Sequence, residues 1–310
     1  MNARTESLEP GIHRLPMAEY LADPCVVPSL SSGCAFRLVN ESPFHAWHSH
    51  PRLGAAHRDF SSVADTGTTT HDLLLGGEGK ICVINPADYR SKPTKECPEG
   101  AIPVGWTNGA IRAARDEARA NGLTPMLAAD MFSVRAAVEA CRGFLAQSDL
   151  AGVLDDGESE LTVIGRIGDT WLRTRPDWLN PKMRISLSFK TTKASVHADS
   201  FGRMAKSMGY LFAQEFYRRC LVEATGDDYR HVILAQEQTA PYACALYESA
   251  PAQIAIDSAQ VSRALEIWRR CMESSQWPGY GRGVQRIEPK AWELAAEEER
   301  LQTEELESMG

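Results

Sequence analysis

Three charged residues, Glu160, Asp177 and Lys190, lie in the segment GESELTVIGRIGDTWLRTRPDWLNPKMRISLSFKTTKAS. Hydrolysis of a phosphodiester at neutral pH needs a divalent cation, which neutralises developing charge and lowers the pKa of an attacking water. Mg²⁺ prefers oxygen ligands such as the two carboxylates, and an ammonium group can orient a hydroxide or stabilise charge on the phosphate. The residue types in this segment therefore predict metal-dependent phosphodiester hydrolysis.

Neighbouring strands must position these residues. The stretches ELTVIGRI, DTWLRTR and MRISLSFKT are short and β-branched, and turn residues separate them, so we predict three consecutive antiparallel strands. Glu160 begins the first strand, Asp177 lies in the turn between the next two, and Lys190 lies on the third. After them we expect a helix over about 200–225, strands in HVILAQEQ and ACALYES, and a helix over about 258–275.

The rest of the chain suggests one main domain with additions at both ends. Residues 1–60 are rich in Pro, Ser and His and are expected to wrap around the domain, with one helix capped by Ser31 or Ser32. Residues 107–121 and 126–147 are Ala-rich with apolar residues at helical spacing, which predicts two packed helices. We place the main domain at 61–287 and an acidic tail at 288–310.

Charge and cysteine content exclude several classes of protein. The net charge is -8, yet residues 160–220 contain 4 Lys and 7 Arg against 2 Glu and 3 Asp, whereas the stretch from Glu288 holds 8 Glu. A basic middle thus lies inside an acidic protein. The 8 cysteines form no C-x-x-C pair, which excludes the usual zinc-ribbon and iron-sulfur spacings. The lack of a long apolar run and the acidic start argue against membrane insertion and secretion, so we expect a cytoplasmic location in a bacterial host or phage-infected cell.

The order Glu, then Pro-Asp, then x-x-Lys resembles the PD-(D/E)xK nuclease superfamily. The similarity extends along most of the chain, because six ordered segments resemble the RecE-type exodeoxyribonuclease VIII catalytic domain and its phage and prophage relatives. These segments are PSLSSGCAFRLVNESPFHAWHSHPRL, GTTTHDLLLG, RPDW, FKTTKAS, GYLFAQEFY and WPGYG. The resemblance implies an α/β fold with a central mixed sheet flanked by helices.

The resemblance also implies a role for each matching residue. His71, Glu160 and Asp177 would be metal ligands, together with the backbone carbonyl of Phe189, and Lys190 would be the catalytic lysine. The helix segment that faces the active site and contacts the phosphate in such nucleases would contribute Tyr210, Gln214 and Tyr217.

Two positions depart from the family pattern. Ser188 stands two residues before the lysine, where the family has an acid, and a neutral hydroxyl is a poor substitute for a carboxylate ligand to a hard cation. The family's glutamine position holds Ala213, and Gln214 comes one residue later. One helical residue is a rotation of about 100 degrees, which turns Gln214 away from the expected direction.

Several residues have a plausible purely structural interpretation. Glu158 competes with Glu160 for the metal role, and His71 could be a core or helix-capping histidine. The HAWHSH string is better explained by packing than by a metal site, since no carboxylate or cysteine lies nearby in sequence. The side chains that could neutralise DNA phosphates are equally well explained as solvated: Lys182, Arg184, Lys193, Arg203 and Lys206.

The resemblance implies a Mg²⁺-dependent exonuclease, with Mn²⁺ as an alternative ion, that degrades one strand of double-stranded DNA from its 5′ end. The expected partners are DNA ends, a single-strand annealing protein that takes over the 3′ strand, and further copies of the chain in a homo-oligomer. One alternative is a catalytically impaired protein that binds DNA ends or a recombination partner, because Ser188 removes one carboxylate. Another is a metal-dependent nuclease of other polarity or substrate, such as an endonuclease.

Overall fold

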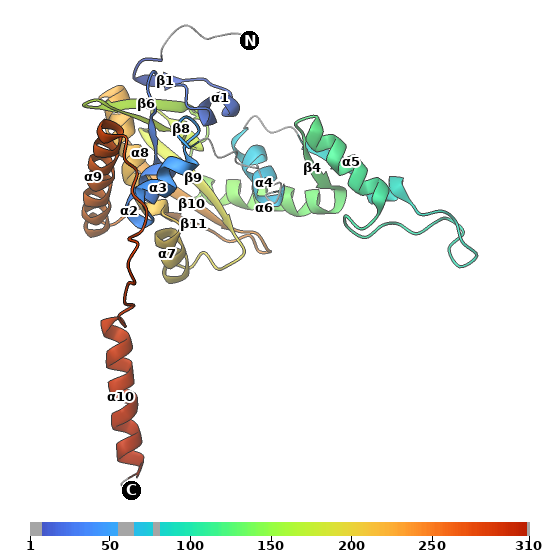
Figure 1. Cartoon of the computed structure of the whole chain (residues 1–310). Helices are drawn as coiled ribbons and strands as arrows, with labels where there is room; N and C mark the ends of the chain where they lie inside the picture. The colour runs from blue at the N-terminus through green and yellow to red at the C-terminus, as the bar shows by residue number, and fades with distance from the viewer. Residues whose placement is uncertain (1–7, 55–64, 77–80, 309–310) are drawn as a thin grey trace. The chain divides into compact units, whose positions relative to one another are not determined.

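The computed structural model describes residues 8–54, 65–76 and 81–308 (Figure 1). The chain forms two compact units, Met1–Trp277 and Pro278–Gly310. The predicted boundary at residue 60 lies outside the described residues, and the boundary at 287 stays a prediction.

The first unit contains a five-stranded sheet in the order β11-β10-β9-β8-β5. Strands β9 and β10 are parallel, and the other neighbours are antiparallel. The strands of this sheet are β5 (Glu158–Ser159), β8 (Trp178–Asn180), β9 (Ile185–Thr192), β10 (Arg230–Glu237) and β11 (Cys244–Tyr247).

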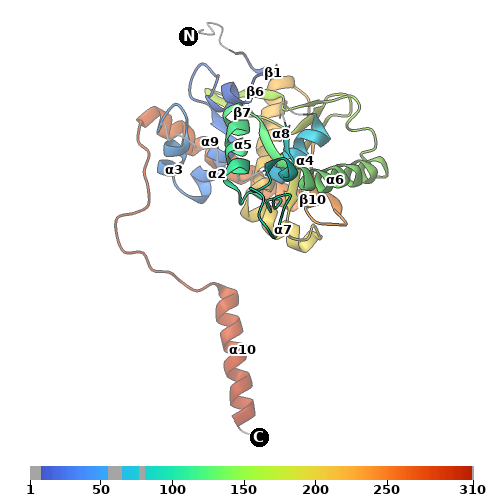
Figure 2. The ribbon, with the colours of Figure 1, turned by 90° about the vertical axis from the view of Figure 1, so that its right-hand side faces the viewer.

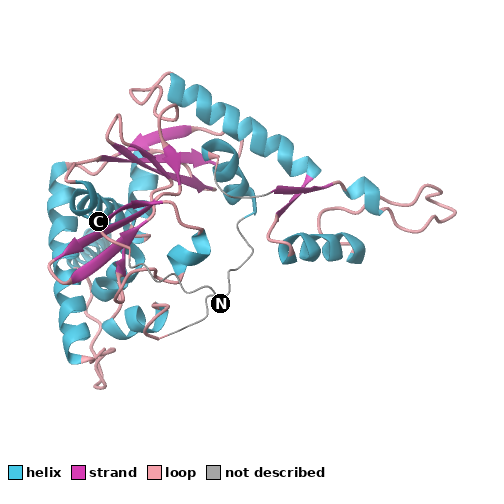
Figure 3. Cartoon of the chain, turned by 90° about the horizontal axis from the view of Figure 1, so that it is seen from above, coloured by secondary structure: helices cyan, strands magenta, loops and turns pink. Residues whose placement is uncertain are grey.

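A second sheet has four strands in the order β1-β6-β7-β2, and a separate parallel pair is formed by β3 and β4. In Figure 3 the β3–β4 pair lies apart from the two larger sheets. These strands are β1 (Gly11–His13), β2 (Leu30–Ser31), β3 (Ile81–Ile84), β4 (Thr124–Leu127), β6 (Thr162–Ile167) and β7 (Thr170–Thr174).

Helices cover the sheets on both sides. In the first unit they are α1 (Met17–Leu21), α2 (Ser32–Asn40), α3 (Pro43–Ser49), α4 (Asp65–Leu75), α5 (Gly109–Ala120), α6 (Ala128–Ala146), α7 (Ala198–Ser207), α8 (Tyr210–Thr225) and α9 (Pro251–Ser274), with a 3₁₀ turn η1 at Pro86–Tyr89. Mixed sheets flanked by helices confirm the predicted fold class. Ser31 caps α2 as expected, because its side chain accepts a hydrogen bond from the backbone N–H of Cys34.

Two apolar layers hold the elements together. One lies between α8, α9, α2 and the four-stranded sheet and includes Phe216, Trp268 and Leu172. Figure 2 shows α2 and α9 near each other, and they are in contact. The other layer packs α4 and α6 against β9 and β10 through residues such as Leu74 and Leu187. The helices predicted at 107–121 and 126–147 both form, but the prediction that they pack together is wrong: α5 packs mainly on β3–β4 and α6 mainly on α4.

The prediction of three consecutive antiparallel strands is wrong for the third strand. Strands β6 and β7 pair as expected, but the chain then leaves the four-stranded sheet, and β9 pairs with β8 and β10 instead. Strand β8 lies in the segment that was predicted to be a turn. All of the residues from Thr170 to Asn180 are buried except Asp177, so burial draws this connection into the five-stranded sheet and leaves one carboxylate accessible.

The single helix predicted over about 200–225 is also wrong, because it divides into α7 and α8. Gly209 separates them with a φ of +72°, a left-handed conformation that glycine adopts without steric cost. A Cβ atom at this position would lie 2.8 Å from the ring of Phe36, which packs against the turn. The break therefore sets the direction of α8 relative to α7.

Residues 8–54 attach to the four-stranded sheet through buried polar groups. Asp23 accepts hydrogen bonds from the backbone N–H and the hydroxyl of Ser29, and its carboxylate lies 3.4 Å from a guanidinium nitrogen of Arg173 on β7. His50 Nε2 lies 3.0 Å from the Ser29 carbonyl oxygen and 3.4 Å from Asp23 Oδ2. Partnered charges of this kind can be buried without the large cost of an isolated ion.

The second unit contains one described helix, α10 (Ala291–Ser308), preceded by an extended stretch whose residues are exposed from position 278 onward. Within residues 8–54, 65–76 and 81–308, no helix has the length and apolar character needed to cross a lipid bilayer.

Candidate active site

A pocket of about 800 Å³ opens where α4, the start of β6, the β7–β8 connection and β9 meet. Its lining includes four predicted site residues that are far apart in sequence: His71, Glu160, Asp177 and Lys190. Three of these, His71, Glu160 and Asp177, offer ligand atoms that all lie within 4.8 Å of one another. The folded chain thus brings the predicted metal ligands together.

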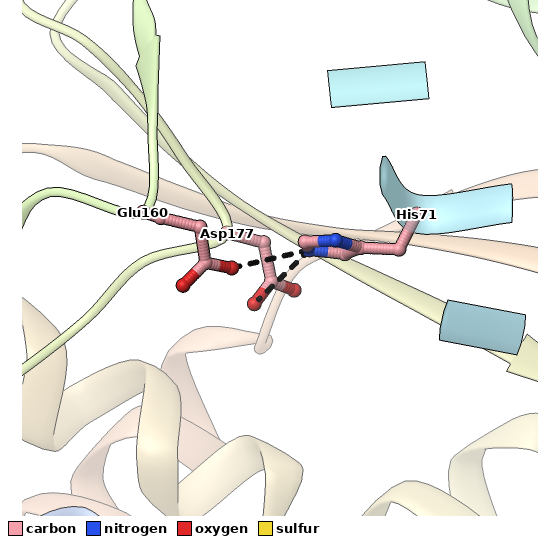
Figure 4. Close-up of side chains that lie close together, drawn as sticks. All are labelled: His71, Glu160 and Asp177. Atoms are coloured by element: carbon pink, nitrogen blue, oxygen red, sulfur yellow. Dashed lines mark ion pairs between the residues drawn. The ribbon is translucent and has the colours of Figure 1, made fainter. Parts of the chain in front are cut away.

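One nitrogen of the His71 ring faces both carboxylates from the same side (Figure 4). Its Nε2 atom is 3.4 Å from Glu160 Oε1 and 3.8 Å from Asp177 Oδ1. Its Nδ1 atom is 3.5 Å from Asp72 Oδ1, so the neighbouring acid faces the other side of the ring. A carboxylate on the far nitrogen is the usual arrangement for a histidine that presents its free nitrogen to a metal ion.

Asp177 is held in place by the strand that follows it. Its Oδ2 atom accepts hydrogen bonds from the backbone N–H of Phe189 at 2.6 Å and from Lys190 Nζ at 3.0 Å. Burial disfavours the charged carboxylate, but the charges and hydrogen bonds of Lys190 and His71 outweigh it and hold the pKa of Asp177 well below its usual range. The other oxygen, Oδ1, faces His71. Asp177 therefore presents an ionised carboxylate oxygen to the pocket, where a metal ion could bind it.

Glu160 projects from a backbone in the left-handed region, with a φ of +57°, directly before β6. Arg175 Nε donates to its Oε2 atom at 2.6 Å, which leaves Oε1 toward His71. Burial raises the pKa of Glu160, and the hydrogen bond from Arg175 opposes that effect. The competing Glu158 lies on β5, pairs with the exposed Arg14 and is absent from the pocket lining. The geometry therefore favours Glu160 over Glu158 as a ligand.

The pocket also shifts the pKa of His71. Burial lowers the pKa of this imidazole, but hydrogen bonds and charges from Asp177, Asp72 and Glu160 prevail and raise it to about 9. The ring is a cation at neutral pH when only carboxylates face it. A divalent cation in the same place would displace this proton, because metal ligation requires neutral imidazole.

Lys190 reaches Asp177 from β9 and is mostly shielded from solvent. Burial lowers the pKa of its ammonium group, but the charge and hydrogen bond of Asp177, together with Tyr217 and Tyr210, outweigh this effect and raise the pKa above its usual value. Its Nζ atom lies 5.7 Å from the centre of the Tyr210 ring. An adjoining cavity of about 230 Å³ is lined by Lys190, Ser188, Tyr210 and Tyr217. The two predicted tyrosines therefore lie beside the lysine.

Ser188 and Lys190 are two residues apart on β9 and share one face of the strand. The Ser188 hydroxyl lies 3.4 Å from His231 Nε2, and His231 Nδ1 lies 2.9 Å from the Ser186 hydroxyl. Burial lowers the pKa of His231 to about 3, so its ring is neutral. No sequence motif pointed to His231, although it becomes the neighbour of Ser186 once β9 and β10 pair in parallel.

The structure does not bring Gln214 to the pocket. Its amide donates to the His231 carbonyl at 3.2 Å, and its carbonyl accepts from the Ser249 hydroxyl at 2.7 Å. It lines a separate cavity on the other side of His231. The one-residue shift along the helix accounts for this direction.

The predicted DNA-contacting side chains are dispersed. Lys193 lines the pocket, and Arg203 and Lys206 are exposed on α7. Lys182 pairs with Asp156 at 2.8 Å, and Arg184 pairs with Asp227 at 2.9 Å, both outside the pocket lining. Further lining residues, to which the sequence analysis assigned no role, are Met17, Thr66, Gly67, Thr68, Asp72, Thr124, Arg175, Thr191 and Gln238.

Comparisons with known proteins agree with the fold. One solved structure, from Eubacterium rectale and described as a "putative exonuclease", aligns with a TM-score of 0.53 at 9% sequence identity, covering 92% of this chain and 99% of that chain. At this identity the likeness shows the fold alone. The solved structure of SSO0001 aligns with a TM-score of 0.25 at 14% identity, covering 69% of this chain and 94% of that chain, which is too low to support an argument.

A search of curated proteins finds no match. The PDDEXK-like domain of unknown function (DUF3799) matches residues 126–288, which include Glu160, Asp177 and Lys190. This match covers more than half of the chain, and the fold and the clustered carboxylates agree with it. The chain belongs to the family of the PDDEXK-like domain of unknown function (DUF3799).

Proposed function

We propose that this protein is a divalent-metal-dependent nuclease that hydrolyses phosphodiester bonds of double-stranded DNA. The observation that carries the proposal is the cluster of His71, Glu160 and Asp177, with Lys190 bonded to Asp177, in the pocket of a PDDEXK-like chain. The two carboxylates suit Mg²⁺ and Mn²⁺, the ions we expect here.

The donor set fits such an ion. Glu160 Oε1, Asp177 Oδ1 and His71 Nε2 face one another, and we propose the Phe189 carbonyl as a further ligand. When bound, the cation would supply charge neutralisation at the phosphate and a more acidic water. Lys190 holds its ammonium 3.0 Å from Asp177 Oδ2, where it can position the nucleophile and counter the charge that develops on the phosphate. Tyr210 and Tyr217 restrict the space beside that ammonium.

We further propose that the substrate is a DNA end and that degradation starts at the 5′ end, leaving a 3′ single strand for an annealing protein. This polarity, the recombination role, a homo-oligomeric state and a cytoplasmic location follow from the RecE-type resemblance. Lys193 at the pocket and Arg203 and Lys206 on α7 are the cations that we assign to phosphate contacts.

A second candidate function is favoured by Ser188. With the Ser188 hydroxyl 3.4 Å from His231 in place of an acid, the described metal-ligand cluster contains two carboxylates, Glu160 and Asp177. In this alternative the protein binds DNA ends or a recombination partner and hydrolyses little or nothing.

The test uses linear duplex DNA labelled at the 5′ or the 3′ end and incubated with purified protein and Mg²⁺, Mn²⁺ or a chelator. We expect metal-dependent release of 5′-terminal nucleotides, no attack on covalently closed circular DNA, and no release by Asp177→Asn. Binding of DNA ends without release under any metal condition would favour the second candidate. Cleavage of the closed circle would make the protein an endonuclease.

A further inference from the structure

Arg175 is a buried arginine whose hydrogen bonds reach three different parts of the fold. Its Nε donates to Glu160 Oε2 at 2.6 Å, and one terminal nitrogen donates to the Leu15 carbonyl at 2.7 Å and the Thr162 hydroxyl at 3.1 Å. The guanidinium carbon also lies 5.8 Å from the centre of the Tyr20 ring. Its side chain is 4% exposed, so these contacts fix it against the protein interior.

The two oxygens of Glu160 consequently face different partners. Oε2 accepts from Arg175, and Oε1 lies 3.4 Å from His71 Nε2 on the inner side of the cluster. A glutamate carboxylate without such a partner has several accessible rotamers, and ordering it costs free energy. Arg175 therefore removes that freedom and leaves one oxygen directed at the place where a cation would bind.

The orientation of Glu160 is especially important in this chain because Ser188 stands where the family has an acid. Glu160 and Asp177 are the carboxylates of the described His71 cluster, and Ser188 adds none. Asp177 is already fixed by Phe189 and Lys190, whereas the bond to Glu160 comes from Arg175.

We propose that Arg175 is a positioning residue that orients Glu160 toward the metal site and links residues 8–21 to it through the Leu15 carbonyl. The inference rests on the proposed metal-dependent function and concerns the same site. Arg175 contacts neither substrate nor cation; it acts through Glu160. The segment from residue 8 to α1 is thereby part of the support of the active site as well as a wrapping element.

The test measures metal affinity without DNA, using Tb³⁺ luminescence and its displacement by Mg²⁺ on the full chain. Arg175→Gln should weaken binding by about 10- to 100-fold, the usual effect of removing a group that orients a metal ligand. In a Glu160→Gln background the same substitution should change the affinity by less than about 2-fold, because the residue through which it acts is gone. Equal losses in both backgrounds would mean a general structural effect and would overturn the proposal.

Arg173 is the matched control. It is also a buried arginine, contacts Tyr20 and is bonded to residues 8–54 through Ser29, but it points to Asp23 instead of Glu160. Arg173→Lys should lower the unfolding midpoint and leave the metal affinity of the folded protein unchanged. If Arg175→Gln does not fold, Arg175→Lys replaces it, with a smaller loss expected only when Glu160 is present.

The two possible failures are distinguishable. A wild-type chain that binds neither Tb³⁺ nor Mg²⁺ overturns the proposed function and this inference with it. A wild-type chain that binds the metal while Arg175→Gln binds equally well overturns only the role of Arg175.

Discussion

Lys190 illustrates how one side chain can be central to chemistry and marginal to stability. Its ammonium is fixed by a single hydrogen bond to Asp177, beside the Tyr210 ring, and it makes no other described ion pair. Removing it leaves Asp177 bonded to the Phe189 backbone, so the strand connection keeps its local support. The pocket, however, loses the cation that we propose faces the reacting phosphate.

We therefore expect Lys190→Ala to lower the hydrolysis rate by at least about 100-fold, on the scale of losing one charge-stabilising group in an active site, while the protein stays folded. Release of end label and the circular dichroism melting curve would be measured on the same preparation. Lys182→Ala is the control, because Lys182 is exposed and outside the pocket lining. Undiminished release by folded Lys190→Ala would remove this lysine from the mechanism.

Ser188 gives a second prediction at the same scale. It shares a strand face with Lys190, so a carboxylate there would point toward the region beside the cluster. Ser188→Asp should raise hydrolysis by about 10-fold or more and lower the Mg²⁺ concentration needed for half-maximal rate, since Mg²⁺ gains an oxygen ligand.

The same assay on Ser188→Asn provides a control of similar size without the charge. If Ser188→Asp stays at background in both metal affinity and hydrolysis, a missing acid does not explain low activity, and the DNA-binding alternative becomes stronger.

The family resemblance predicted four side chains that the structure brings together at the pocket, although it also included Gln214, which lies elsewhere. His71, Glu160, Asp177 and Lys190 do lie together, whereas no motif indicated the support that Arg175 provides. The direction of a guanidinium depends on tertiary contacts such as the Leu15 carbonyl, which lies 160 positions away in the chain. Sequence spacing does not contain that information.

At the scale of elements, the break at Gly209 sets the course of α8, which carries Tyr210 and Tyr217 to the lysine. Gly209 combines two constraints, a φ of +72° and a ring 2.8 Å from any added Cβ. Gly226, at the other end of α8, has a φ of +76° and no atom within 4 Å of the corresponding position. Substitutions at the two positions can therefore be compared to distinguish the cost of a strained backbone from the cost of steric overlap.

Gly226→Ala should lower the free energy of unfolding by about 1 kcal/mol, the cost of a left-handed alanine. Gly209→Ala should cost at least about 1 kcal/mol more, because the Phe36 ring must also move. Urea denaturation of both variants would measure the difference. Equal losses would show that the α7–α8 turn adapts without strain.

Short elements explain most of what the sequence could not predict about the fold. The strands β6 and β7 and the helices α2, α5 and α6 have clear periodicity or a cap, and each forms as expected. The strand β8 has three residues and β4 has four, which is too short for a periodic pattern, and their pairing depends on strands contributed by distant parts of the chain. In the helix predicted over about 200–225, the apolar spacing continues across Gly209. The sequence pattern therefore did not predict the break between α7 and α8.

At the scale of the whole molecule, charge is unevenly distributed. The chain carries a net charge of -8, yet the stretch 160–220, which supplies Glu160, Asp177 and Lys190 to the pocket, is rich in Lys and Arg. The acidic residues of α10 belong to a separate unit. An acidic protein of this kind can still bind DNA through a local basic surface, since phosphate contacts depend on nearby charges.

Duplex-end binding should therefore weaken steeply with salt, because phosphate contacts release condensed counterions. Replacing Lys193 and Arg203 together with Gln should reduce the slope of log affinity against log salt by up to about 2, one unit for each cation that no longer meets a phosphate. Fluorescence anisotropy over a salt series in Ca²⁺ would measure the slope. The paired exposed cations Lys182 and Arg184 provide the control pair, and an unchanged slope for Lys193 and Arg203 would place the DNA elsewhere.

The buried contact between Asp23 and Arg173 has a consequence for acid tolerance. Burial alone would raise the pKa of Asp23, but hydrogen bonds and charges from His50, Arg173 and Ser29 lower it below its usual 3.8. Unfolding in acid is then coupled to proton uptake by Asp23. The contribution of ionised Asp23 to stability is complete above the pKa of the unfolded state and is lost as the pH falls through the lower pKa of the folded state.

Asp23→Asn should be less stable than the wild type at neutral pH. Its urea midpoint should fall less steeply than that of the wild type between pH 7 and pH 3. Acid thus weakens the attachment of residues 8–54 to the four-stranded sheet at Arg173.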